Sequence, residues 1–293
     1  MLEWIKISLQ EVNAEINKLE TGSNPPLNVD VDPETALICI NEVEEKLRNK
    51  PNIKAILAVH LYGNGINMPK LNKVARSYNC IVIEDCAQSA GTKILGKYAG
   101  TFSDAGTFSF FPTKNLAALG DGGGVWVSNK KLQTKIESLR QYGWNKNRVV
   151  KVANGMNSRL DELQAVVLQI RLKDLKRDNQ KRRNIAKLYD LNLSSYFARL
   201  TFPDFQFCSF HLYVVKVKHR KKLMNYMKKH NIFLGIHYTP PNHLNGLLSK
   251  FSAKLPITEL LSKEVVSLPI HPELDSKTQI KIIKTLNNFE DTL

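Results

Sequence analysis

The chain has 293 residues, of which 43% are hydrophobic, and a formal net charge of +15. This length and composition are typical of a globular protein with a sizeable core, built as one large or two smaller domains, and no apolar run is long enough to span a bilayer. The first residues show no basic segment followed by an apolar segment, so we expect a cytoplasmic protein without membrane contact.

The positive charge is concentrated in the second part of the chain. Residues 1–120 hold 12 Lys/Arg against 13 Asp/Glu, whereas residues 121–293 hold 30 against 14. Such a field attracts phosphates, including a diphosphate on a small substrate, although scattered lysines more often serve solubility alone. The basic runs at 176–177, 181–183 and 219–222 contain no aromatic residues for base stacking, which makes nucleic acid an unlikely partner.

The cysteines are too scattered for a disulfide scaffold or a structural zinc site. No Cys-x-x-Cys pair is present, so we expect reduced thiols and no metal. The four positions are Cys39, Cys80, Cys86 and Cys208.

At the start of the chain, apolar residues recur at spacings of three and four between positions 2 and 19, which predicts an amphipathic helix. The following TGSNPP segment at 21–26 ends that helix, because glycine and two prolines break it. Residues 1–28 are therefore interpreted as an N-terminal helix and linker.

The next elements form a βαβ unit. Residues 53–59 are apolar and β-rich, 69–78 have helical spacing, and 81–83 are again strand-like. Parallel strands joined by a crossover helix belong to an α/β sheet, in which ligands bind beyond the carboxyl ends of the strands. The segments His60–Gly63 and Glu84–Gln88 occupy those ends, so we expect them to face one crevice.

Two further short strands are predicted at 107–111 and 123–127, and the loop between them carries Lys114. A lysine amine attacks a carbonyl only when it is neutral, so an isolated lysine in a polar loop near Asp85 suggests imine chemistry. Taken singly, Asp85 has the simpler interpretation of a helix cap and Lys114 that of a solvated loop residue.

A long helix is predicted from Ser158 onward into the Lys/Arg-rich stretch, and it leads to a smaller second domain. That domain contains a predicted strand at 211–217, a basic helix at 221–229 and a proline-rich loop at 238–241. We place the sheet domain at 29–185 and the small domain at 186–293.

Several separated segments form a recognisable set: the strand ending in Asp85, the SFFPTK loop at 109–114 and GMNSRLDELQA at 155–165, with VDVDPET at 29–35, VHLYG at 59–63 and LPIHPEL at 268–274. Together, and in this order, they resemble the DegT/StrS family of PLP-dependent sugar aminotransferases. The resemblance covers roughly residues 29–293. It implies the α/β fold of aspartate aminotransferase-like PLP-dependent transferases (fold type I), with a mainly parallel sheet domain and a smaller α+β C-terminal domain.

By resemblance, Lys114 is the catalytic residue that forms the imine with pyridoxal 5'-phosphate and then moves protons, while Asp85 pairs with the pyridine nitrogen. Gln88 is expected to contact the cofactor ring or its phenolic oxygen, and Ser109 to bond the phosphate. The simpler interpretations are a polar loop residue for Gln88 and a strand serine bonded to backbone for Ser109.

The resemblance also implies that Asn157 reaches the cofactor of a partner subunit, which makes a homodimer part of the site. Alone, an asparagine before a helix is usually a cap. His237, Tyr238 and His243 lie in the segment that resembles the family's substrate-facing loop. The implied reaction transfers an amino group from glutamate to a keto sugar on a nucleotide diphosphate.

The resemblance starts late, because the family's segment with a Gly-Thr turn for the phosphate and a ring-stacking aromatic has no counterpart among residues 1–28. We therefore expect an N-terminally shortened member of the family. Two hypotheses follow: a working sugar aminotransferase, or a non-catalytic truncated homologue that lacks stable PLP binding and acts as an interaction partner.

Overall fold

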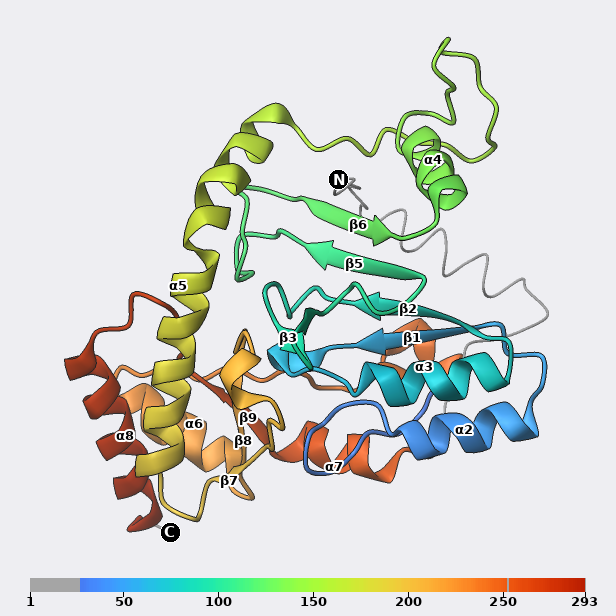
Figure 1. The fold of residues 1–293 in the computed structure, drawn as a ribbon. Coiled ribbons are helices and arrows are strands. Elements are labelled where there is room, and N and C mark those ends of the chain that lie inside the picture. Colours follow the sequence, from blue (N-terminus) through green and yellow to red (C-terminus); the bar gives the residue numbers. More distant parts are fainter. Residues whose placement is uncertain (1–26, 252, 293) are drawn as a thin grey trace.

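The computed structural model describes residues 27–251 and 253–292, so the helix predicted at 2–19 lies outside the described residues (Figure 1). The helices are α2 (Ile40–Asn49), α3 (Met68–Ser77), α4 (Lys130–Leu139), α5 (Glu162–Asn192), α6 (Arg220–Lys229), α7 (Pro256–Glu264) and α8 (Ser276–Glu290). The strands are β1 (Ala55–Val59), β2 (Ile81–Asp85), β3 (Lys93–Ile94), β4 (Lys97–Tyr98), β5 (Ala105–Ser109), β6 (Gly123–Val127), β7 (Ala198–Arg199), β8 (Tyr213–Lys216) and β9 (Val265–Leu268). Short 3₁₀ helices occupy Leu61–Gly63, Phe205–Phe207, Asn242–Leu244 and Gly246–Phe251.

The main sheet has the strand order β1-β2-β5-β6. β1 pairs with β2 and β2 with β5 in parallel, whereas β6 returns antiparallel to β5. The predicted βαβ unit is thus confirmed as β1-α3-β2, and the sheet is mainly parallel as expected. Its carboxyl ends meet at one edge, from which the loops after β1, β2 and β5 emerge.

The helix α3 begins where its sequence predicts a start. Asn67 caps it by accepting a hydrogen bond from the backbone N–H of Lys70 at 3.1 Å, and Pro69 occupies the first turn, where no N–H is needed. Met68, Leu71 and Val74 are buried and belong to the core beneath the sheet.

β5 differs from the strand predicted at 107–111, because it begins at Ala105 and ends at Ser109. Its register places Ala105 opposite Ile83, and a Cβ at Gly106 would collide with the carbonyl oxygen of Gly100. Small residues therefore start the strand, a feature that hydrophobicity alone does not reveal. Phe110 follows the strand and is buried, with its N–H bonded to Gly122.

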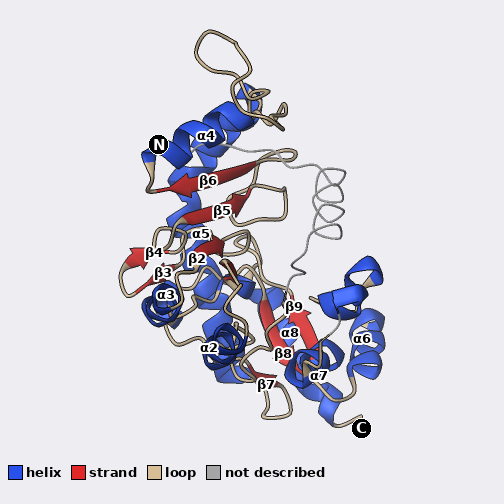
Figure 2. Ribbon diagram, turned by 90° about the vertical axis from the view of Figure 1, so that its right-hand side faces the viewer, coloured by secondary structure: helices blue, strands red, loops and turns tan. Residues whose placement is uncertain are grey.

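A second body forms around the antiparallel sheet β7-β8-β9 with α6 and α8 against it (Figure 2). Its core includes Phe197, Val215, Leu223 and Leu286, all fully buried. α5 contributes to both bodies, since Leu168 packs below the loop after β5 and Ile185 packs in the second core. The helix passes residue 185 without interruption, so the domain boundary proposed there stays a prediction.

Among the described helices, none combines the length and apolarity that a membrane span requires. α5 has 31 residues but carries many charges.

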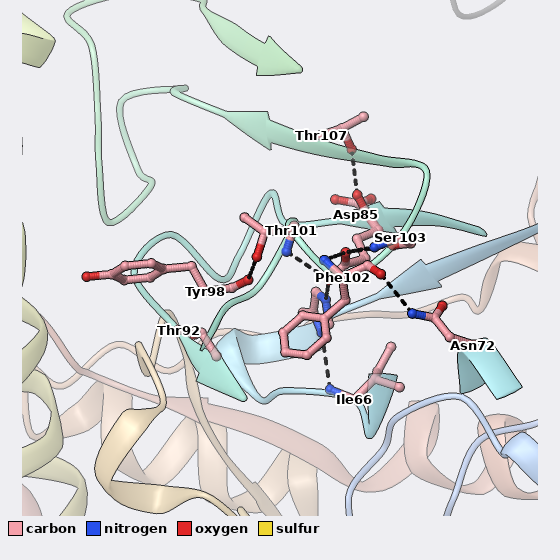
Figure 3. Close-up of polar contacts among 12 residues, drawn as sticks. Ile66, Asn72, Asp85, Thr92, Tyr98, Thr101, Phe102, Ser103 and Thr107 are labelled. Atoms are coloured by element: carbon pink, nitrogen blue, oxygen red, sulfur yellow. Dashed lines mark hydrogen bonds and ion pairs between the residues drawn. The ribbon is translucent and has the colours of Figure 1, made fainter. Parts of the chain in front are cut away.

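A buried acid–base pair fastens β1 to β2. The Glu84 carboxylate accepts hydrogen bonds from His60 Nε2 at 3.0 Å and from the backbone N–H groups of Gly100, Phe102 and Ser103. Figure 3 shows how Ile66, Phe102 and Ser103 lie in this part of the fold. His60 Nδ1 accepts from the N–H of Ile66, which assigns the ring proton to Nε2.

The same pair contributes to the cluster that comes nearest to a metal site among the described residues. His60, Glu84 and Cys86 each place one ligand atom within 4.8 Å of the others. Both ring nitrogens and both carboxylate oxygens are already hydrogen-bonded, and burial raises the pKa of the Cys86 thiol. The cluster is therefore explained as structural.

Replacing Glu84 by alanine should destabilise the protein by about 3–5 kcal/mol, because it leaves buried donors without an acceptor. Denaturant unfolding followed by circular dichroism measures this loss. Glu273→Ala, which removes an exposed ion pair with Lys181, is the control and should leave the midpoint nearly unchanged.

The loss should depend on pH. Burial raises the pKa of Glu84, but the hydrogen bonds from His60, Ser103 and Gly100 outweigh burial and leave the pKa lowered. Its stabilisation is therefore fully present above the ordinary glutamate pKa and disappears as the pH falls through the lowered value. If Glu84→Ala destabilised the protein as much well below that pKa as at neutral pH, the lowered pKa of Glu84 would be contradicted.

Candidate active site

Asp85 lies at the carboxyl end of β2, where the predicted crevice begins. Its Oδ1 accepts a hydrogen bond from the N–H of Ala87 at 2.9 Å, which turns the chain away from the sheet. The side chain is half-buried, and its second oxygen makes no hydrogen bond to the described residues. One carboxylate oxygen is thus available to a ligand.

Lys114 follows β5 in a loop closed by a 2.9 Å bond from its own N–H to the carbonyl of Phe111. Burial lowers the pKa of the Lys114 amine, and the negative charge of Asp85 opposes this shift without cancelling it. The structure therefore brings the predicted acid and lysine into electrostatic range. The amine loses its proton more easily than an ordinary lysine does.

Gln88 connects two segments that are far apart in sequence. Its Oε1 accepts from the backbone N–H of Tyr62 at 2.6 Å, and its Nε2 donates to the hydroxyl of Tyr238 at 2.7 Å. The loops after β1 and β2 therefore meet, as expected from the parallel strands. The proline-rich loop of the second body closes over the same edge.

Tyr62 is a site residue that the sequence analysis missed. It is buried with a positive φ of 61°, and its hydroxyl donates to the carbonyl of His237. His237 Nδ1 lies 2.8 Å from Ser267 Oγ, and burial, followed by the charge of Lys114, lowers its pKa. Two signals were available: the place of Tyr62 after a predicted strand end, and the VHLYG segment at 59–63.

His211 and Asn115 were also missed. His211 Nδ1 lies 3.0 Å from Oδ1 of Asn115, the residue that follows Lys114 in the chain. Burial and then the charges of Lys114, Arg182 and His237 lower the pKa of His211 to about 3. The imidazole is therefore uncharged near neutral pH.

Three predicted residues are not hydrogen-bonded to the group around Lys114. Ser109 ends β5, and its Oγ accepts weakly from the N–H of Phe111 at 3.4 Å. Asn157 is exposed ahead of α5 and accepts from Arg159 Nε at 3.0 Å. His243 is 2% exposed and lies 3.3 Å from a carboxylate oxygen of Glu259.

The arrangement can bind and carry protons. It offers one carboxylate oxygen that no described residue bonds, an amine with a lowered pKa, two uncharged imidazoles and the Tyr238 hydroxyl. A thiol nucleophile is not part of it, because burial raises the pKa of Cys86 far above its usual range.

Comparisons with known proteins find similar sequences among sugar aminotransferases. The dTDP-3-amino-3,6-dideoxy-alpha-D-galactopyranose transaminase of Aneurinibacillus thermoaerophilus is 39% identical over 278 residues, covering 94% of this chain and 76% of that protein. The UDP-2-acetamido-2-deoxy-3-oxo-D-glucuronate aminotransferase of Pseudomonas aeruginosa is 33% identical over 259 residues, covering 88% and 71%.

Solved structures show the same fold. The crystal structure of S. venezuelae DesV in complex with a ketimine intermediate superposes with a TM-score of 0.89 at 29% identity, covering 96% of this chain and 76% of DesV. An aminotransferase from Brucella abortus gives 0.88 at 29% identity, covering 94% and 76%. The expected aspartate aminotransferase-like fold is thereby confirmed. Since the profile of the DegT/DnrJ/EryC1/StrS aminotransferase family matches residues 16–287, the chain belongs to that family.

Proposed function

We propose that this enzyme transfers an amino group from glutamate to a keto sugar carried on a nucleotide diphosphate, using pyridoxal 5'-phosphate. The observation that carries the proposal is the half-buried Lys114, with its lowered pKa, in electrostatic range of Asp85 at the sheet edge. The relatives named above are transaminases of nucleotide-linked sugars. The four cysteines are free thiols, which supports a cytoplasmic setting.

The residues present fit this cofactor. Asp85 has a free carboxylate oxygen for a protonated pyridine nitrogen, and Ser109, with its single weak hydrogen bond, can offer a hydroxyl to the phosphate. Gln88 follows Asp85 by three residues in the loop after β2 and would border the ring. When bound, pyridoxal 5'-phosphate supplies a carbonyl that takes up amines and a ring that accepts electrons from the neighbouring carbon.

The Lys114 amine is suited to hold and move protons. Its lowered pKa leaves a larger neutral fraction than an ordinary lysine has, so Nζ can take a proton from the substrate carbon. The protonated amine can then return the proton at a nearby atom. The Asp85 carboxylate is placed to pair with a cationic ligand.

The substrate is proposed to enter beside the loop that carries His237 and Tyr238. Tyr238 is half exposed, and its hydroxyl is held by Gln88 at the cofactor edge. His237 is anchored on both sides by Tyr62 and Ser267. The burial of His243 against Glu259 favours a supporting role within this loop.

A second copy of the chain is proposed to complete the site. Leu163, Val166 and Ile170 lie on one face of α5, and each is more than half exposed. An apolar helix face of this kind typically packs against a partner. Asn157 lies just ahead of this face and is exposed, which supports its proposed reach into the partner's cofactor site.

Lys114→Ala should abolish covalent capture of the cofactor and lower turnover by at least about 10²- to 10⁴-fold, because the proton-transfer group is lost. The measurement combines visible absorbance after adding pyridoxal 5'-phosphate, borohydride reduction with mass spectrometry, and turnover of a keto sugar nucleotide with glutamate. Lys97→Ala, an exposed lysine in β4, is the matched control. A wild-type chain that captures no cofactor and turns over no substrate would leave the non-catalytic homologue as the correct reading.

Mixing the two inactive variants Lys114→Ala and Asn157→Ala should restore activity if Asn157 acts across the dimer. In a heterodimer of Lys114→Ala and Asn157→Ala, one site combines Lys114 of one subunit with Asn157 of the other, so random exchange should recover roughly a quarter of the sites. Subunit exchange followed by activity assay measures this recovery. If the mixture is no more active than the separate variants, Asn157 does not act on the partner's site.

Gln88→Ala should destabilise the protein by about 1–3 kcal/mol, since it leaves the buried N–H of Tyr62 without an acceptor. Hydrogen exchange should accelerate at residues 62 and 237–238, while the exposed Gln180→Ala change should have no such effect. Unchanged exchange at both segments would show that Gln88 does not hold the loop.

A further inference from the structure

Polar side chains around the Lys114 loop form one hydrogen-bonded chain whose donors and acceptors are fixed. Asn179 Nδ2 donates to the carbonyl of Ala90 at 2.9 Å, and a carbonyl can only accept. Asn179 Oδ1 must therefore accept from Asn115 Nδ2, at 2.8 Å. Asn115 Nδ2 also donates to the carbonyl of Ser209 at 2.8 Å, which sets the orientation of the second amide.

This direction determines the state of His211. Asn115 Oδ1 is the acceptor that remains, so His211 Nδ1, 3.0 Å away, must carry the ring proton. The lone pair of the neutral ring then lies on Nε2, which makes no hydrogen bond to the residues that the structure describes.

The surroundings of the ring keep it neutral. Burial is the largest cause, and the charges of Lys114 after β5 and Arg182 in α5 add to it. His237 in the proline-rich loop acts in the same direction when it is protonated, and the pKa of His211 falls to about 3. Lys114 exerts the largest of these charge effects, and Asn115, the residue that follows Lys114, is hydrogen-bonded to the ring.

We propose that Asn115 and His211 are positioning residues for Lys114, in which Asn115 fixes the loop that carries the lysine and His211 offers the amine an uncharged acceptor at Nε2. The inference rests on the proposed function, in which Lys114 needs a free, oriented amine. An anionic partner would raise the lysine pKa strongly and so keep the amine protonated. A neutral acceptor also orients the amine but raises its pKa less.

The anchoring reaches three other parts of the molecule. Asn115 bonds α5 through Asn179 and the entry to β8 through Ser209. Ser209 Oγ in turn donates to the carbonyl of Gln88 at 3.1 Å. The loops after β2 and β5 are therefore tied through the same asparagine, and both carry proposed cofactor contacts.

The first test is nitrogen-15 NMR of the histidine rings in the full, cofactor-free chain. His211 should show the Nδ1–H tautomer and no titration between pH 8 and pH 5. Asn115→Leu should release this tautomer, whereas Asn72→Leu, which removes a comparable bond to Phe102, should leave it intact. An Nε2–H tautomer, or a midpoint near the ordinary histidine value, would overturn the proposal even if no variant folds.

The second test measures the protonation of Lys114 by competitive amine labelling against pH, read by mass spectrometry on the cofactor-free chain. His211→Leu removes the acceptor and should shift the labelling curve to lower pH by about one unit, a tenfold change in protonation ratio. His211→Gln supplies an amide oxygen and should stay within about twofold of wild type at each pH.

Equal behaviour of the leucine and glutamine variants, with both still folded by their unfolding midpoints, would show a merely structural role for His211. Because neither readout needs cofactor or substrate, a failure here is distinct from a failure of the proposed aminotransferase activity.

Discussion

Parallel pairing of β1, β2 and β5 is the constraint on which the remaining structure depends. Parallel ladders align the carboxyl ends of their strands, so three loops leave the sheet at one edge. Those loops carry Tyr62, Asp85 with Gln88, and Lys114. The pairs His60–Glu84 and Tyr62–Gln88 then fix the first two loops against each other.

The second body brings further side chains to this edge. His237 and Tyr238 come from its proline-rich loop, and His211 from the entry to its central strand. Burial is the largest cause of the lowered pKa of the Lys114 amine. The same burial keeps His211 uncharged. The lowered pKa values of the site thus depend on the packing of both bodies, and neither body would produce them alone.

Local sequence patterns located the two groups proposed to react more readily than the side chains that surround them. Asp85 and Lys114 follow β-rich segments, and their places at strand ends could be inferred from local patterns. Glu84 and Asp85 are adjacent, yet strand alternation buries Glu84 completely and leaves Asp85 facing the crevice. Asn115 and His211 meet across 96 residues, a pairing for which the sequence carries no local signal.

The amino-acid sequence by itself determined the α/β class, the order of the elements and the family, because hydrophobic periodicity and short motifs are local properties. Only the tertiary structure decided which side chains face Lys114, where β5 begins, and which protonation states the site favours. Those features depend on burial and on contacts between distant segments, and both exist only once the chain has packed.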